Sequence, residues 1–109
     1  MKKLLSLFAL LSTLLLATPA VLAWDGAVTG KITSIDVAPG GNYGFRITLV
    51  GSPPMFTGGM TWAYLNDTDS NYKVYVAVVL LAKAQGTPIT VYTTNSDAFC
   101  HVGYIAASN

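Results

Sequence analysis

Three polar residues stand at alternate positions, Asp67, Asp69 and Asn71, and their two aspartates form the densest group of carboxylates in the sequence. This spacing opens an EF-hand calcium loop, which also needs glycine at its sixth position and a bidentate glutamate at its twelfth. Those two positions hold Tyr72 and Val78, and the sequence contains no glutamate. We therefore interpret the segment as the start of a helix, where Asp and Ser side chains accept hydrogen bonds from free amides. No metal or other cofactor is expected.

The residue types that carry catalysis are present but badly spaced for it. Cys100 and His101 are adjacent, and neighbouring side chains of a strand point to opposite faces, so this thiol and this imidazole cannot pair. Cys100 is predicted to be a buried structural residue. The remaining aspartates form no acid–base pair, and the two Gly-Gly pairs lack the Lys-Ser/Thr of a phosphate loop. The sequence therefore predicts a protein that is not an enzyme.

The first 23 residues have the pattern of a secretory signal peptide. Lys2 and Lys3 precede an apolar run from Leu4 to Leu16, and small residues stand at the two positions that a signal peptidase recognises in Val21-Leu22-Ala23. The apolar run is shorter than the roughly 20 residues of a spanning helix, although a retained membrane anchor is the alternative. We expect an exported protein, periplasmic or secreted, with a single domain over residues 24–109.

The composition of residues 24–109 limits the classes of partner. Four basic and five aspartate residues leave a formal net charge of −1, and nucleic-acid binding requires a basic face. No second apolar run predicts a membrane span after signal cleavage. A domain of 86 residues is only just large enough to fold alone, and one cysteine permits no disulfide within the chain. Assembly into oligomers is the expected source of additional stability.

The alternation of apolar residues predicts an unusual first strand. Val28, Gly30 and Ile32 share one face, and the phase then changes so that Ile35 and Val37 share the other. A phase change within a strand indicates a bulge and a strong bend.

The remaining segments predict four more strands and one helix. Residues 72–86 also alternate like a strand, but their length and helix-favouring end indicate a helix with Gly86 as C-cap. Because this helix is apolar nearly all round, we expect it to be largely buried. The order β-β-β-α-β-β describes a mainly β fold with one helix. It is the order of the OB-fold, a small five-stranded barrel, although other small α+β folds share it. The predicted strands are residues 27–37, 43–51, 60–65, 88–94 and 99–107.

Several short segments resemble a known family. They are DGAVTGKI (25–32), YGFRITLVG (43–51), the Tyr-rich helix, AQGTPITVYT (84–93) and the last strand with its cysteine. Together they are similar to the B subunits of subtilase cytotoxin and of its pertussis-like and typhoid-toxin relatives. The resemblance implies an OB-fold, a homo-pentameric ring, binding of cell-surface glycans that often end in sialic acid, and a possible A subunit as partner.

The resemblance also implies a sugar site. A DG-x-x-SG stretch on the family's first strand supplies a serine that hydrogen-bonds the sialic-acid carboxylate, and here it corresponds to Asp25 to Gly30, with Thr29 in place of the serine. Thr29 and Lys31 are predicted to point outward, and Lys31 would favour an acidic sugar. A tyrosine on the family's fourth strand lines the same site, and its nearest matches are Tyr92 and Thr93.

The resemblance leaves two further expectations. The family's last-strand cysteine pairs with a second cysteine, whose expected position holds Met55 or Phe56, so Cys100 should be a free buried thiol. Two tryptophans and six tyrosines could stack on sugars, or could pack the barrel and its subunit contacts. We therefore expect an exported glycan-binding module, with an accessory protein-binding module without a sugar site as the alternative.

Overall fold

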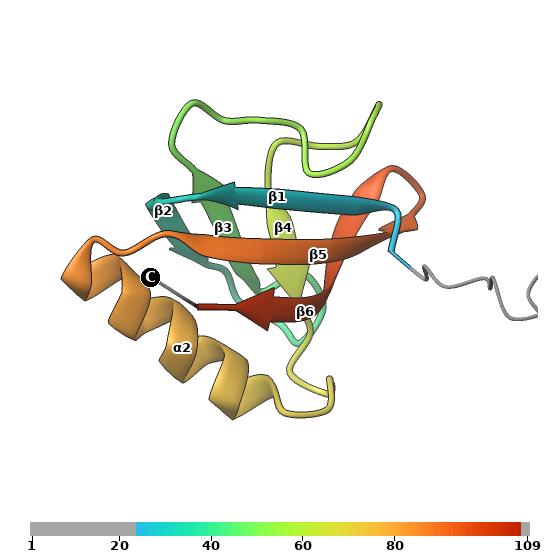
Figure 1. Ribbon diagram of the computed structural model, residues 1–109. Helices are drawn as coiled ribbons and strands as arrows, with labels where there is room; N and C mark the ends of the chain where they lie inside the picture. The colour runs from blue at the N-terminus through green and yellow to red at the C-terminus, as the bar shows by residue number, and fades with distance from the viewer. Residues whose placement is uncertain (1–23, 108–109) are drawn as a thin grey trace, which may run out of the picture.

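The computed structural model describes residues 24–107, so the predicted signal peptide lies outside the described residues. Within this range the chain is mainly β and forms one mixed sheet with one helix against it (Figure 1). The elements are β1 (Gly26–Gly30), β2 (Ile32–Val37), β3 (Phe45–Leu49), β4 (Ala63–Leu65), α2 (Tyr72–Gln85), β5 (Ile89–Ser96) and β6 (Phe99–Ala106).

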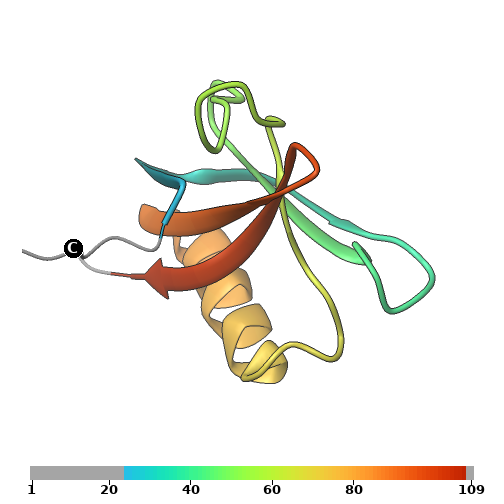
Figure 2. The ribbon, with the colours of Figure 1, turned by 90° about the vertical axis from the view of Figure 1, so that its right-hand side faces the viewer.

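The sheet has six strands in the order β1-β5-β6-β4-β3-β2. All neighbours are antiparallel except β4 and β6, which are parallel. β1 and β2 lie at the two ends of this order, although only Lys31 separates them in the chain. The sheet therefore curls strongly, as Figure 2 shows. It is not closed, because β1 and β2 do not pair with each other.

The predicted first strand, residues 27–37, is two strands, which is why the sheet has six strands and not five. β1 pairs with β5, whereas β2 pairs with β3. The predicted bulge is confirmed, because the register of β2 against β3 shifts between Ile32 and Ser34. An extra residue at such a place bends the strand and increases its twist, which allows two consecutive segments to serve opposite ends of one sheet.

The core lies on the concave side of the sheet. Phe45, Ile47 and Leu49 are buried as the alternation predicts, and the side chains between them face outward. From the loop between β3 and β4, Met55 and Phe56 also enter the core. This loop carries Pro53 and Pro54 and contains no strand, as the two prolines predict.

The helix is confirmed, but its burial is not. α2 ends at Gly86, whose positive φ of 68° forms the predicted C-cap. Only Val79 and Ala82 are buried, while the large apolar residues on its outer side are 51–61% exposed. The prediction of a largely buried helix is therefore wrong, because α2 lies against the sheet along one side only (Figure 1). These outer residues are Val74, Leu80 and Leu81.

No helix between residues 24 and 107 is long and apolar enough to span a membrane.

The start of α2 also differs from the prediction. The N-cap residue is Asn71, in the left-handed region at φ 61°, and no side chain accepts a hydrogen bond there. Asp67 is exposed, and the Asp69 carboxylate binds other groups. The prediction that these aspartates cap the helix is therefore wrong. The Asp69 backbone carbonyl, which accepts from the Tyr72 amide at 3.1 Å, provides the local contact instead.

Candidate functional site

Two threonine hydroxyls meet on the outward face of the sheet where β1 pairs with β5. Thr29 is exposed and lies directly opposite Thr90 in the register. Their Oγ1 atoms are 2.7 Å apart, so one hydroxyl donates to the other. Each hydroxyl can also bond to a group from outside. The structure thus places Thr29 outward, as its position in the alternation predicts.

Beside these hydroxyls, three aromatic rings form what we call the Trp24 cluster. The Trp24 ring lies 6.0 Å from Tyr92 and 6.3 Å from Tyr104, measured between centroids. Tyr92 and Tyr104 are cross-strand partners and meet edge to face at 5.2 Å. Trp24 packs on the backbone of β6 at Gly103, where a Cβ atom would collide with the indole ring. The glycine therefore makes room for Trp24.

The two predicted charged residues take different positions. Lys31 is exposed between β1 and β2, two residues beyond Thr29. Asp25 lies at the other end of β1, where its Oδ2 accepts a hydrogen bond from the Asn95 amide at 2.7 Å and its own amide donates to the Thr93 carbonyl at 2.8 Å. Asp25 thus attaches the start of β1 to β5, whereas Lys31 is available at the surface.

Tyr92 and Thr93, the two candidates for the site residue on the predicted fourth strand, point to opposite faces of the sheet. Tyr92 lies on the outward face, opposite Ala27 and next to Thr90. Thr93 is fully buried, and its hydroxyl donates to the Met55 carbonyl at 3.0 Å. The structure therefore brings Tyr92 and Thr29 to one face, while Thr93 faces the core and holds the loop between β3 and β4. Lys31 is exposed in the link between β1 and β2 and belongs to neither strand.

A hollow of about 570 Å³ lies between β1 and the loop that joins β3 to β4, and none of Thr29, Thr90 and Tyr92 lines it. Its walls are residues 25–28 of the first strand and residues 54–58 of the loop between β3 and β4. The loop is held close to β1 because Gly26 has no side chain, and a Cβ atom there would overlap the Met55 carbonyl. The segment that resembles the family's sugar-binding motif thus borders an open hollow.

A second group of rings, the Trp62 cluster, lies on the outward face of β3, β4 and β6. Tyr64 is its centre and is only 3% exposed. His101 stacks on Tyr64 at 4.9 Å with the planes 12° apart, and Tyr43 meets Tyr64 edge-on at 4.5 Å. Burial raises the pKa of the Tyr64 hydroxyl above its ordinary value. The members of the cluster are Tyr43, Trp62, Tyr64, Phe99 and His101.

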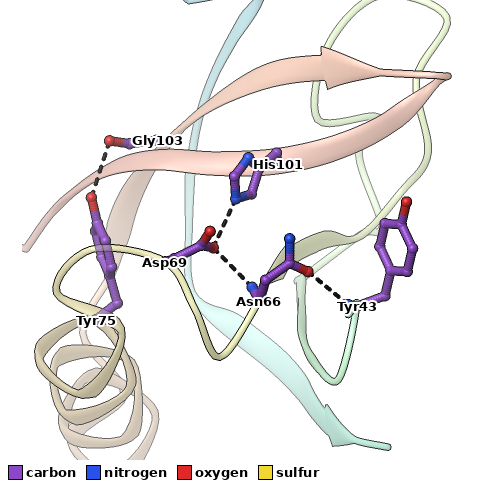
Figure 3. Close-up of polar contacts among 6 residues, drawn as sticks. All are labelled: Tyr43, Asn66, Asp69, Tyr75, His101 and Gly103. Carbon is purple, nitrogen blue, oxygen red and sulfur yellow. Dashed lines mark hydrogen bonds and ion pairs between the residues drawn. The ribbon is translucent and has the colours of Figure 1, made fainter. Parts of the chain in front are cut away.

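A chain of polar contacts fixes the edge of the Trp62 cluster, as Figure 3 shows. Asp69 Oδ2 lies 2.7 Å from His101 Nε2 and accepts from the Asn66 amide at 2.8 Å. Asn66 Oδ1 in turn accepts from the Tyr43 amide at 2.8 Å. Among residues 24–107, the Asp69–His101 pair is the single contact between a carboxylate and a basic side chain within ion-pair distance. Sequence reasoning missed this network, because the partners are far apart in the chain.

Cys100 takes the position predicted for it. It is buried and unbridged, its thiol lies 3.5 Å from the Met60 carbonyl, and burial raises the pKa of that thiol. Since His101 faces outward on the same strand, the prediction that the two side chains cannot pair is confirmed. Among the described residues, no three His, Cys or Asp side chains lie close enough together to hold a metal ion.

The outward face of β1 and β5 thus presents two hydroxyls beside aromatic rings. Comparison of the chain with known proteins adds no relative to this picture: no family model, no curated protein and no solved structure matches it.

Proposed function

We propose that this protein is an exported, non-enzymatic glycan-binding module. The observation that carries the proposal is the Thr29–Thr90 hydroxyl pair beside the Trp24 cluster on an exposed face. Sugars present hydroxyl groups next to apolar C–H faces, so they need directed hydrogen bonds beside an aromatic surface. This face offers both within two residues along β5.

Each group on the face has a distinct role in the proposal. Thr29 and Thr90 bond to sugar oxygens, and Tyr104, which is 52% exposed, provides a ring for stacking. Lys31 supplies the positive charge that favours an acidic sugar such as sialic acid. Asp25 positions β1 through Asn95 and does not contact the ligand.

An OB-fold is the finer fold that we propose for the curled sheet. Counted as one bent strand, β1 and β2 reduce the sheet to five strands, and this strand then pairs with both β3 and β5. The helix between β4 and β5 and the parallel pair of β4 and β6 accompany that arrangement. A bulged first strand that serves both halves of the sheet is a feature of such barrels.

We propose that the module assembles into a ring-shaped homo-oligomer, a pentamer by the family resemblance, with an A subunit as a possible partner. Exposed Val74, Leu80 and Leu81 on α2 support assembly, because such a patch gains free energy when a neighbour covers it. Light scattering should show a particle of several chains at micromolar concentration. A stable monomer would remove this part of the proposal.

The alternative function is binding of another protein without a sugar site. It is favoured by the same residues of α2 and by a hollow of about 360 Å³ between α2 and β6, lined in part by Val74, Val78 and Ile105. Aromatic and aliphatic side chains beside a hollow are typical of such interfaces.

A glycan array probed with the protein separates the two functions. The proposal expects binding to a group of related glycans, stronger for those with acidic ends. Binding that weakens as salt is raised would agree with a contribution from Lys31. If a folded, assembled protein binds none of the glycans, the proposed function is wrong and the protein-binding alternative takes its place.

A further inference from the structure

The Trp62 cluster carries a cation that the proposed sugar site does not use. Arg46 points outward from β3, and its guanidinium carbon lies 4.6 Å from the centre of the Trp62 ring. Its Nε donates to the Tyr43 carbonyl at 2.8 Å. A ring contact and a hydrogen bond together hold the plane of the guanidinium group in one orientation.

The terminal nitrogens of Arg46 have no carboxylate partner among residues 24–107. The cross-strand neighbours of Arg46 are Asp36 on β2 and Tyr64 on β4. Asp36 lies beyond ion-pair distance, and its Oδ2 instead accepts a hydrogen bond from the Ser34 hydroxyl at 3.1 Å. A fixed, half-buried guanidinium group thus keeps donors available for a group from outside.

The surroundings suit a carboxylate attached to a compact ring. Two parallel N–H groups of arginine match the two oxygens of a carboxylate, which gives short, charge-assisted bonds. The half-buried rings of Tyr43, Trp62 and Phe99 reduce the water around this position and so strengthen the pair.

We propose that Arg46, held over the Trp62 ring, anchors a second binding site, separate from Thr29, for the carboxylate of an acidic sugar. The nature of the ligand rests on the proposed function, whereas the site rests on the geometry of Arg46. One chain would then hold two sugars on different parts of the sheet, which raises the avidity for a surface that displays many of them.

The two tryptophans allow each site to be observed separately. The sequence contains only Trp24 and Trp62, one in each cluster, so their indole N–H signals in an NMR spectrum report on the two sites. The isotope-labelled protein is titrated with sialyllactose and, as the matched sugar without a carboxylate, with lactose. The proposal expects the Trp62 signal to move with sialyllactose and to stay in place with lactose.

Two variants test the role of Arg46. Arg46→Lys keeps the charge but loses the planar fork, and Arg46→Met keeps apolar contact with Trp62 and loses the charge. Both should weaken the Trp62 response about tenfold or more, while the Trp24 response and the melting temperature of Arg46→Lys stay close to those of the wild type.

The outcomes separate the second site from the proposed function. If sialyllactose moves Trp24 and leaves Trp62 in place, the second site is wrong and the proposed function stands. A Trp62 response to lactose, or one that survives in Arg46→Met, also overturns the second site. If neither tryptophan responds to either sugar, both proposals fail for these ligands.

Discussion

The Trp24 cluster and the Trp62 cluster contain similar residues but differ in what holds them in place. The Trp62 cluster is fixed by polar contacts. The Asp69 carboxylate binds the His101 ring and the backbone amide of Asn66, and the Asn66 side chain accepts from the Tyr43 backbone amide. Tyr64 at the centre of the cluster is almost fully buried. No such network surrounds the Trp24 cluster within the described residues, where Trp24 is held by packing on Gly103, and Tyr104 is half exposed.

This difference shows that aromatic composition does not by itself indicate a binding site. Rings that are surrounded by satisfied polar groups stabilise the fold, and most of the Trp62 cluster is of this kind. Rings that keep an open face next to hydroxyls that can form a further hydrogen bond can exchange water for a ligand. The Trp24 cluster meets this condition, and in the Trp62 cluster only the edge at Arg46 does.

The largest expected effect comes from breaking the network of the Trp62 cluster. Asp69→Ala removes the acceptor of both His101 and the Asn66 amide, and a half-buried donor without a partner costs about 1–3 kcal/mol. Urea unfolding should show this loss. Asp67→Ala is the matched control, because Asp67 is exposed and should change stability by less than about 0.5 kcal/mol. Equal stabilities of the two variants would contradict a structural role for the network.

A smaller effect on stability is expected from disturbing the Trp24 cluster. In Gly103→Ala the new methyl group would collide with the Trp24 ring. Overpacking costs about 1–3 kcal/mol, and the low end applies because Trp24 precedes the first strand and can move aside. The Trp24 fluorescence should shift toward that of a solvent-exposed indole. Gly30→Ala is the control, since its Cβ meets Leu49 at an ordinary 3.6 Å. An unchanged spectrum in Gly103→Ala would show that Trp24 does not lie on β6.

The smallest effect expected is a pH dependence of stability that comes from Tyr64 in the Trp62 cluster. Burial holds the pKa of Tyr64 above its ordinary value of 10.0, so folding favours the neutral phenol. The stability that this provides is complete below pH 10 and is lost as the pH rises above it, because the unfolded chain then releases the proton first. Tyr64→Phe should lose less stability than the wild type as the pH rises above 10. Parallel losses in the two proteins would argue against the burial of Tyr64.

Much of the fold could be predicted because it depends on local patterns. Alternation identified the faces of β3, the phase change identified the bulge before Ser34, and Gly86 identified the end of the helix. The exposure of α2 could not be predicted, because it depends on how much of the helix the sheet covers.

In the candidate site, too, local patterns predicted some features, and contacts between distant residues determine the others. Alternation placed Thr29 outward, but only the register shows that Thr90 is its partner and that Tyr92, and not Thr93, shares its face. Asp69 was predicted to cap α2, because a local cap is what the sequence Asn66 to Asn71 favours. The actual partner, His101, is 32 residues away. No local pattern contains such a contact.

The binding affinity of Thr29→Ala for a glycan selected on the array tests the central claim most directly. Thr29→Ser is its matched control, because it keeps the hydroxyl and removes only the methyl group. The account predicts that Thr29→Ala loses about 1–3 kcal/mol of binding free energy, the value of a hydrogen bond to a charged group, and that Thr29→Ser retains most of the affinity. Both variants should unfold at the same urea concentration as the wild type. A Thr29→Ala protein that binds as tightly as the wild type would show that the outward face of β1 is not the sugar site.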